Sequence, residues 1–462
     1  MRIIRYNYPF ILGVLLFALL QGCSITSMRV NSLASQLESD PPEQVLSKLE
    51  KIAFPERDRV QFLLNYGILK SLSGDFEASI KDLQTAKKVI QQVEAISISE
   101  NIGAVTVNDT LKSYVATPGE QMLIHQILVT NYLLTGQLNE ARVEVLQAQV
   151  KAKKFAETSE MIGRLASMEY LAGLVYELLN EVDSAMISYR NAARFMKKRE
   201  MDIPSVLQNS LLRCSYSLGL KNEYKKYVKL YGKKAERVDT KKGELTVIFW
   251  DGIVSAKKQN FITVYVPKLE HNVTLALPYY SDQTKPINPL TFTTGDKVYN
   301  TVPIENVEKI VREDLEAQQK VIYSTALARM ITKHLAIKMS QGKNTEGLSI
   351  LLNIASVLTE AADVRSWNML PSSIQVARVR LAPGRYQLFP SKVKGKIAAE
   401  KNNLWDKLFS ITRLKDKAEE PSLSTSIVKG KKLDEFMLDI KAGQKVLLFI
   451  PGVTNRVYSH YM

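Results

Sequence analysis

Four stretches between residues 58 and 234 repeat one arrangement of small and large residues. In each, a helix-length run is followed by a short polar turn and then by a second helix-length run with Ala or aromatic residues at helical spacing. The turns fall near Gly74, Gly136, Asn180 and Asn222. Small residues such as Gly67 let two helices approach closely, while large residues fill the space beside them. The pattern predicts four antiparallel helix pairs.

Such pairs are typical of tetratricopeptide-like (TPR-like) repeats, which stack into a solenoid. A regular array repeats at about 34 residues, whereas these turns are 62, 44 and 42 residues apart. We therefore expect an irregular TPR-like domain over residues 58–234, with an insertion at 94–119. This insertion has alternating Ile and Ser residues, β-branched residues and a Pro-Gly pair, which predict an ordered loop.

The start of the chain resembles an exported bacterial lipoprotein. Two basic residues precede about a dozen apolar residues, too few to cross a bilayer. The lipobox-like sequence that follows consists of Leu20, Gln21, Gly22 and Cys23. The resemblance implies that residues 1–22 are a cleaved signal peptide. It also implies that Cys23 is acylated, for example with palmitate, and that residues 23–57 form a lipidated N-terminus and tether.

Ser24 stands where an Asp commonly signals retention in the inner membrane. We therefore expect a lipid-anchored protein of the outer membrane that faces the periplasm. Each buried methylene of an acyl chain contributes about 0.8 kcal/mol, so several chains hold such a protein firmly.

Charge and cysteine content limit the partners and the covalent chemistry. The formal charge of +15 becomes +13 once Arg2 and Arg5 leave with the signal peptide. A basic chain attracts anionic lipid, polyanionic glycan or an acidic protein, and nucleic acid is not an expected partner in the periplasm. Acylation of Cys23 would leave Cys214 as the second cysteine, without a partner for a disulfide. We expect Cys214 to be a small buried apolar residue.

After residue 234 the pattern changes to β-strands. Runs rich in β-branched and aromatic residues occur at 244–250, 261–266, 273–277, 374–381 and 446–450. Helical spacing interrupts them between residues 302 and 362. We expect an α+β multidomain protein in which the helical repeats precede a β-rich, sandwich-like or barrel-like module. Its parts would be residues 235–300 and 364–462, separated by a helical pair at 301–363.

Two further segments could contact a membrane. The nearly uncharged helix expected at 346–362 is shorter than 18 residues, so we favour burial between domains over insertion into a bilayer. A basic insertion at 391–420 contains a short amphipathic helix, which could dock on a membrane or a partner. Packing of its tryptophan onto the protein's own domain is the favoured alternative. The apolar face of this helix includes Leu404, Trp405, Leu408 and Phe409.

The sequence lacks the usual catalytic motifs. His125, His271, His334 and His460 are far apart and have no metal-ligand spacing, and we find no Walker loop and no G-x-S-x-G sequence. We therefore predict no catalytic residue, no metal and no cofactor, and we do not expect an enzyme. An alternative is a hydrolase whose acid, base and orienting groups are Asp109, Glu120 and His125. Capping by the Asp and packing by the His is the favoured interpretation.

Two groups of residues carry a resemblance to a known family. The first, a candidate interaction loop, consists of Asn108, Asp109, Thr110, Tyr114, Glu120 and His125. The first group also includes residues 107, 131–133 and 141–144, and the second lies at 362–367, 370–371, 377–378 and 383–386. Together they resemble an uncharacterised family of Gram-negative outer-membrane lipoproteins with TPR-like helices, over about residues 60–390. This resemblance implies the fold and brings no assigned activity.

Three functions remain open at this point. The leading hypothesis is a scaffold or assembly factor that binds envelope proteins through the concave surface of its solenoid. The alternatives are a glycan-binding or lipid-binding module and a hydrolase near Asp109 and His125.

Overall fold

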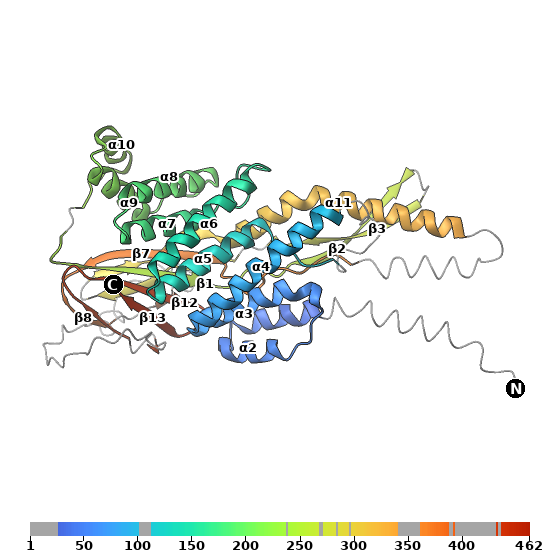
Figure 1. The fold of residues 1–462 in the computed structure, drawn as a ribbon, viewed down its shortest axis with the longest axis horizontal. Helices are drawn as coiled ribbons and strands as arrows, with labels where there is room; N and C mark the ends of the chain where they lie inside the picture. Colours follow the sequence, from blue (N-terminus) through green and yellow to red (C-terminus); the bar gives the residue numbers. More distant parts are fainter. Residues whose placement is uncertain are drawn as a thin grey trace, which may run out of the picture.

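The structure is a computed structural model, in which helices form the N-terminal half and strands with one long helix form most of the C-terminal half (Figure 1). The residues that it describes are 26–100, 112–236, 239–267, 271–282, 285–294, 297–340, 361–387, 391–392, 431–432 and 436–462. The lipobox and Cys23 lie outside these residues, as do Asn108, Asp109, Thr110 and the expected amphipathic helix at 404–409.

The four predicted helix pairs are present. They are α3 (Arg59–Ser73) with α4 (Phe76–Glu100), α5 (Pro118–Leu134) with α6 (Leu138–Ala156), α7 (Ala166–Leu178) with α8 (Val182–Lys198), and α9 (Ser205–Ser217) with α10 (Lys221–Tyr231). Gly74, Gly136 and Asn180 adopt positive φ angles at the first three turns. A Cβ atom on Gly67 would lie 2.5 Å from Leu83 Cδ2, so the predicted close approach of α3 and α4 is confirmed.

Three local expectations were wrong. Helix α4 continues to Glu100, so residues 94–100 are helix rather than loop, because no Gly or Pro interrupts the run. The Pro-Gly pair at 118–119, expected in the loop, lies inside the first turn of α5, where Pro is tolerated and Thr117 forms the capping box with Glu120. The fourth turn lies at residues 218–220, where Gly219 has a positive φ, and Asn222 belongs to α10.

The start of the described chain is packed rather than extended. Residues 26–36 form a helix and are followed by α2 (Pro42–Glu50) and the 3-10 helix η1 (Glu56–Asp58). Val30, Leu33 and Leu37 recur at helical spacing and are buried in the core. This part of the expected tether is therefore fixed on the protein.

A six-stranded mixed sheet is the centre of the β part, with the order β10-β13-β12-β1-β7-β6. Its strands are β1 (Gly243–Asp251), β6 (Val302–Asn306), β7 (Ser373–Leu381), β10 (Lys431–Lys432), β12 (Lys445–Pro451) and β13 (Arg456–Tyr461). Strand β1 is parallel to β12 and antiparallel to β7. The expected barrel is instead an open sheet, with β10 and β6 at its edges and the helices on one face. Its other face packs on strands of smaller sheets, as in the expected sandwich-like arrangement.

Smaller sheets complete this part. They are β2 (Lys258–Val266) with β3 (His271–Tyr279), β4 (Leu290–Thr294) with β5 (Lys297–Asn300) and β9 (Ser391–Lys392), and β8 (Gly384–Gln387) with β11 (Met437–Ile440). Helix α11 (Val307–Ser340) runs beside β3 (Figure 1). Most of the second helix of the expected pair lies outside the described residues, and residues 361–362 are not helical.

Alternating side chains place the sheet between two layers. On β1, Ile248 and Trp250 join the core of the helical repeats, whereas Val247 and Phe249 join a second core with β4 and β11. The inner helices α5, α7 and α9 contact the sheet strands, and Tyr458 of β13 donates a hydrogen bond to the carbonyl oxygen of Leu72 at 3.0 Å. The helical repeats and the sheet therefore share one hydrophobic core.

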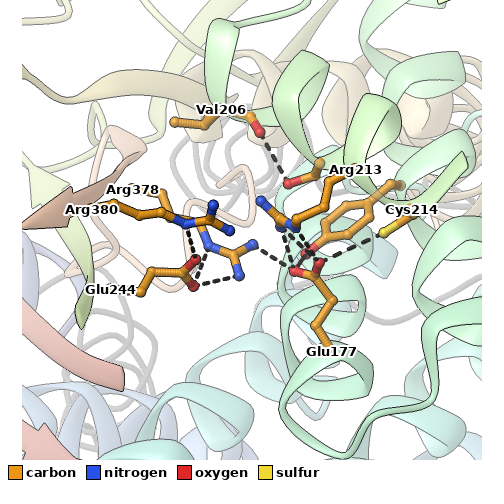
Figure 2. Close-up of polar contacts among 9 residues, drawn as sticks. Glu177, Val206, Arg213, Cys214, Glu244, Arg378 and Arg380 are labelled. Atoms are coloured by element: carbon orange, nitrogen blue, oxygen red, sulfur yellow. Dashed lines mark hydrogen bonds and ion pairs between the residues drawn. The ribbon is translucent and has the colours of Figure 1, made fainter. Parts of the chain in front are cut away.

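A buried ionic network joins the helical repeats to the six-stranded sheet (Figure 2). Glu177 at the end of α7 accepts hydrogen bonds from Arg213 of α9 at 2.7 Å and from Arg378 of β7 at 2.5 Å. Arg378 also donates to Glu244 of β1 at 2.7 Å, and Tyr189 donates to Glu177 at 2.8 Å. Burial alone would raise the pKa of Glu177, but the two arginines outweigh it and hold that pKa well below its usual range.

Two carboxylates from the C-terminal half contact helix N-termini in the N-terminal half. Asp314 of α11 accepts from the backbone N–H of Gly119 at 2.8 Å and from the Thr117 hydroxyl at 2.5 Å. Glu305 of β6 accepts from the backbone N–H of Ser167 at 3.1 Å. The first N–H groups of a helix lack partners within the helix, so these carboxylates supply them. Burial raises the pKa of Asp314 to about 7 against these hydrogen bonds.

We predict that Arg378→Ala lowers the free energy of unfolding by about 3–5 kcal/mol, because it leaves two buried carboxylates without their shared cation. Urea denaturation followed by circular dichroism measures the loss. Arg385→Ala is the matched control, because its pair with Asp439 is exposed and contributes at most about 1 kcal/mol. Equal effects of the two substitutions would contradict a central role for the network.

The raised pKa of Asp314 also predicts a pH dependence of stability. Its folded-state pKa of about 7 lies above the ordinary value of 3.8, so protonation favours the folded state. This stabilisation is complete below pH 3.8 and is lost as the pH rises through 7. Asp314→Asn should remove a slope of at most about 1.4 kcal/mol per pH unit. Urea denaturation between these pH values tests this, with exposed Asp183→Asn as control; an unchanged slope in Asp314→Asn would contradict it.

Candidate docking groove

A groove of about 670 Å³ lies between the outer helices α4 and α6, above the N-terminal half of α5. Ile90 of α4 and Ile124 of α5 contribute apolar surface to it, and both side chains are buried. Its remaining lining residues are Lys87, Gln91, Glu94, Gln121, His125, Val143, Leu146, Gln147, Val150, Lys151 and Lys154. The groove therefore combines an apolar floor with a polar rim.

One wall of the groove is an exposed apolar stripe on α6. Val143, Leu146 and Val150 have exposed fractions of 52%, 41% and 73%. They follow one another at helical spacings of three and four residues, so they share one face of the helix. The core-facing side of α6 is a separate stripe, formed by Ala141, Val145, Ala148 and Ala152. The exposed stripe is thus additional to the surface that α6 uses for packing.

Lysines surround this stripe. Lys87 of α4 donates to Glu144 at 2.6 Å and to Gln147 at 2.8 Å, and so bridges the two walls at one end. Lys151 lies 3.6 Å from Glu94 at the other end, and Lys154 is exposed on the rim. Lys87 and Lys151 are paired with Glu144 and Glu94, so Lys154 supplies the excess positive charge of the groove.

His125 and Glu144 form a buried pair beneath the groove. His125 Nδ1 contacts Glu144 Oε1, and the two side chains are 4% and 2% exposed. Burial lowers the pKa of His125 and outweighs the attraction of Glu144. Burial alone would raise the pKa of Glu144, but His125 and Lys87 hold it below its usual value. A neutral imidazole therefore donates its Nδ1–H to an ionised carboxylate.

We predict that Glu144→Ala destabilises the protein by about 3 kcal/mol, because it leaves His125 and Lys87 without their shared acceptor. Chemical denaturation monitored by circular dichroism gives the difference. Exposed Glu140→Ala on the same helix is expected to change stability by no more than about 0.5 kcal/mol. A loss in Glu144→Ala as small as that of the control would show that the pair does not hold α4, α5 and α6 together.

The structure separates the predicted loop residues into two places. Tyr114 donates to Glu120 at 2.6 Å, and Glu120 also accepts from the backbone N–H of Trp367 at 2.7 Å. His125 lies elsewhere, beside Glu144 and the groove. Glu120 and His125 are therefore not brought together as an acid and a base, although both lie on α5.

The two groups of family-like residues meet at Tyr114. Arg365 lies over the Tyr114 ring, 5.8 Å from its centre, and donates to Asp58 at 2.8 Å and to Asp363 at 2.6 Å. The segment from residue 363 to 367 is thus bound to the start of α5 and to the N-terminal helices. This arrangement gives these residues a structural role.

Further chemistry is sparse in the described part of the chain. Cys214 is buried as predicted, and burial raises the pKa of its thiol to about 12. No group of three His, Cys, Asp or Glu side chains among the described residues is placed to hold a metal ion. None of the described helices has both the length and the apolar surface that crossing a bilayer requires.

The groove was not predicted from the sequence. The available signal was the spacing of Val143, Leu146 and Val150 on a helix that already had a small-residue face. Whether another part of the chain covers that second face depends on the tertiary arrangement, which the sequence of α6 alone does not contain.

Searches of protein-family models and of curated proteins found no match. Among solved structures, MamA AMB-1 is similar to 45% of this chain over 90% of its own, with 12% identity and a TM-score of 0.28. BtubC (BKLC) from P. vanneervenii matches 48% of this chain over 94% of its own, with 12% identity and a TM-score of 0.29.

A third similar structure is the Rap conjugation gene regulator of plasmid pLS20 in complex with the Phr* peptide. It matches 41% of this chain and 45% of its own, with 16% identity and a TM-score of 0.27. Scores this low do not establish a common fold or a common function.

Proposed function

We propose that this protein is a lipid-anchored scaffold of the bacterial outer membrane that binds an envelope protein through the groove between α4 and α6. The observation that carries the proposal is the exposed apolar stripe of Val143, Leu146 and Val150. Exposed apolar residues that form a continuous stripe with a polar rim are typical of protein-binding surfaces.

The position of the sheet favours the outer helices as the binding surface. A solenoid usually binds through a concave face, but here α5, α7 and α9 pack against the protein's own strands. The expectation that a partner occupies the inner side of the repeats is therefore replaced by docking on the outer side. The groove between α4 and α6 lies on that outer side.

The anchor supports a scaffold that works beside a membrane. An acyl group on Cys23 would precede the first described helix by three residues. Such an anchor, facing the periplasm, would confine the protein to a thin layer and raise its effective concentration for partners in the same layer. An assembly or secretion complex of the cell envelope is the context that this proposal favours.

We do not propose a catalytic role for His125 or Glu144. The buried His125–Glu144 pair is linked to Lys87, so its polar groups serve the packing of three helices.

Binding of anionic lipid or glycan is the second candidate function, because α10 has no buried residue and is strongly basic. The lysines on and just after this helix are Lys221, Lys225, Lys226, Lys229, Lys233 and Lys234.

Site-specific photo-crosslinking in intact cells tests the scaffold. With a benzophenone amino acid in place of Val150, we expect one or a few envelope proteins to be captured and identified by mass spectrometry. The matched control is the same amino acid in place of Ile187, which is 55% exposed on α8 outside the groove. Capture from position 150 should also decrease in a Cys23→Ser background, because the anchor no longer concentrates the protein.

Equal capture from positions 150 and 187 would contradict docking at the groove. Capture that is unchanged by Cys23→Ser would contradict the role of the anchor. Recovery of bulk lipid or glycan alone would favour the second candidate function.

A further inference from the structure

We infer that the groove accepts an amphipathic α-helix that carries acidic residues two turns apart beside an apolar stripe. This inference rests on the proposed function and names the chemistry of the partner. It follows from the shape of the apolar surface and from the positions of the lysines around it.

The shape of the groove favours a helix over a small molecule. A small ligand is usually enclosed, with most of its surface buried, whereas the apolar wall here opens outward and Val150 is 73% exposed. Covering Val143, Leu146 and Val150 together requires a ligand that extends over two turns of α6. A second helix laid along α6 presents side chains at matching three-residue and four-residue spacings.

The charges define the second feature of the ligand. Lys87 approaches α6 at Gln147, and Lys154 lies seven residues further along that helix. At 1.5 Å per residue these positions are about 10 Å apart. Lys87 uses two of its three N–H groups on Glu144 and Gln147, and its side chain is 11% exposed. Carboxylates two turns apart on a docked helix would therefore meet the exposed ammonium of Lys154 at one position and the third N–H of Lys87 at the other. A basic helix would meet the same lysines with repulsion.

The first test uses a synthetic probe with the mature full-length chain carrying Cys23→Ser. The probe is a fluorescent amphipathic peptide of about 18 residues, long enough to be helical, with Leu at helical spacing and Glu two turns apart. A second peptide has Lys in place of each Glu. Fluorescence anisotropy should show that the acidic peptide binds at least about tenfold more tightly, and that added salt weakens this binding.

Matched substitutions then locate the binding site. Val150→Glu and Lys154→Glu should each weaken binding of the acidic peptide by about tenfold. Ile187→Glu introduces the same charge on an exposed apolar residue of α8, and Lys153→Glu removes an exposed lysine of α6 that does not line the groove. Both controls should change affinity by less than about twofold. Circular dichroism of all four variants verifies that they are folded.

Several outcomes would overturn the inference. These are equal binding of the two peptides, equal effects of groove and control substitutions, or displacement of the peptide by a fluorescent fatty acid that binds the same groove. Self-association of the chain that Val150→Glu abolishes would identify a second copy as the occupant. If photo-crosslinking at position 150 captures a partner while the acidic peptide fails to bind, the scaffold stands and only the helical, acidic character of the partner is rejected.

Discussion

Arg378 is the side chain on which the union of helices and sheet depends most directly. Its side chain is 8% exposed, and its guanidinium lies between Glu177 of the helical repeats and Glu244 of the adjacent strand. A buried guanidinium without both carboxylates would retain much of its desolvation cost. A shift of β7 by one residue in its pairing with β1 would turn Arg378 away from the helices. The network therefore favours one register of β7 and one position of the sheet on the helices.

The same principle recurs where Asp314 and Glu305 contact the starts of α5 and α7. Each is a carboxyl group from the C-terminal half that accepts hydrogen bonds from backbone N–H groups of the N-terminal half. These contacts hold the N-terminus of α5 on α11 and the N-terminus of α7 on β6. With the inner side committed to packing, the outer helices carry the surface that remains for a partner. The groove is thus a consequence of how the repeats are held.

Local features of the fold could be predicted from the sequence, because their causes are local. Gly67 marks a close helix approach and Gly74 a turn, and both conclusions need only neighbouring residues. The sheet order could not be predicted, since β1 pairs with β12 across a long sequence separation. The capping of α5 by Asp314 was missed for the same reason, although Thr117 and Glu120 already form a capping box.

The candidate site was predictable only in part. Tyr114, Glu120 and His125 were singled out, but which of them would meet depended on the rotation of α5, which directs Glu120 toward Trp367 and His125 toward Glu144. The stripe on α6 was not predicted to be exposed. Its exposure follows from its place on the side of α6 opposite the core-facing stripe of that helix.

The pairing of β1 with β12 also determines when the fold can be completed. Glu244 and Lys445 are neighbours in the sheet although about 200 residues separate them in the chain. The helix pairs make mostly local contacts, which form early, whereas strands this distant must wait for a large loop to close. Until then the inner surfaces of α5, α7 and α9 are exposed to water and to other chains. A chaperone that shields this surface would therefore act in the interval between formation of the repeats and arrival of β12.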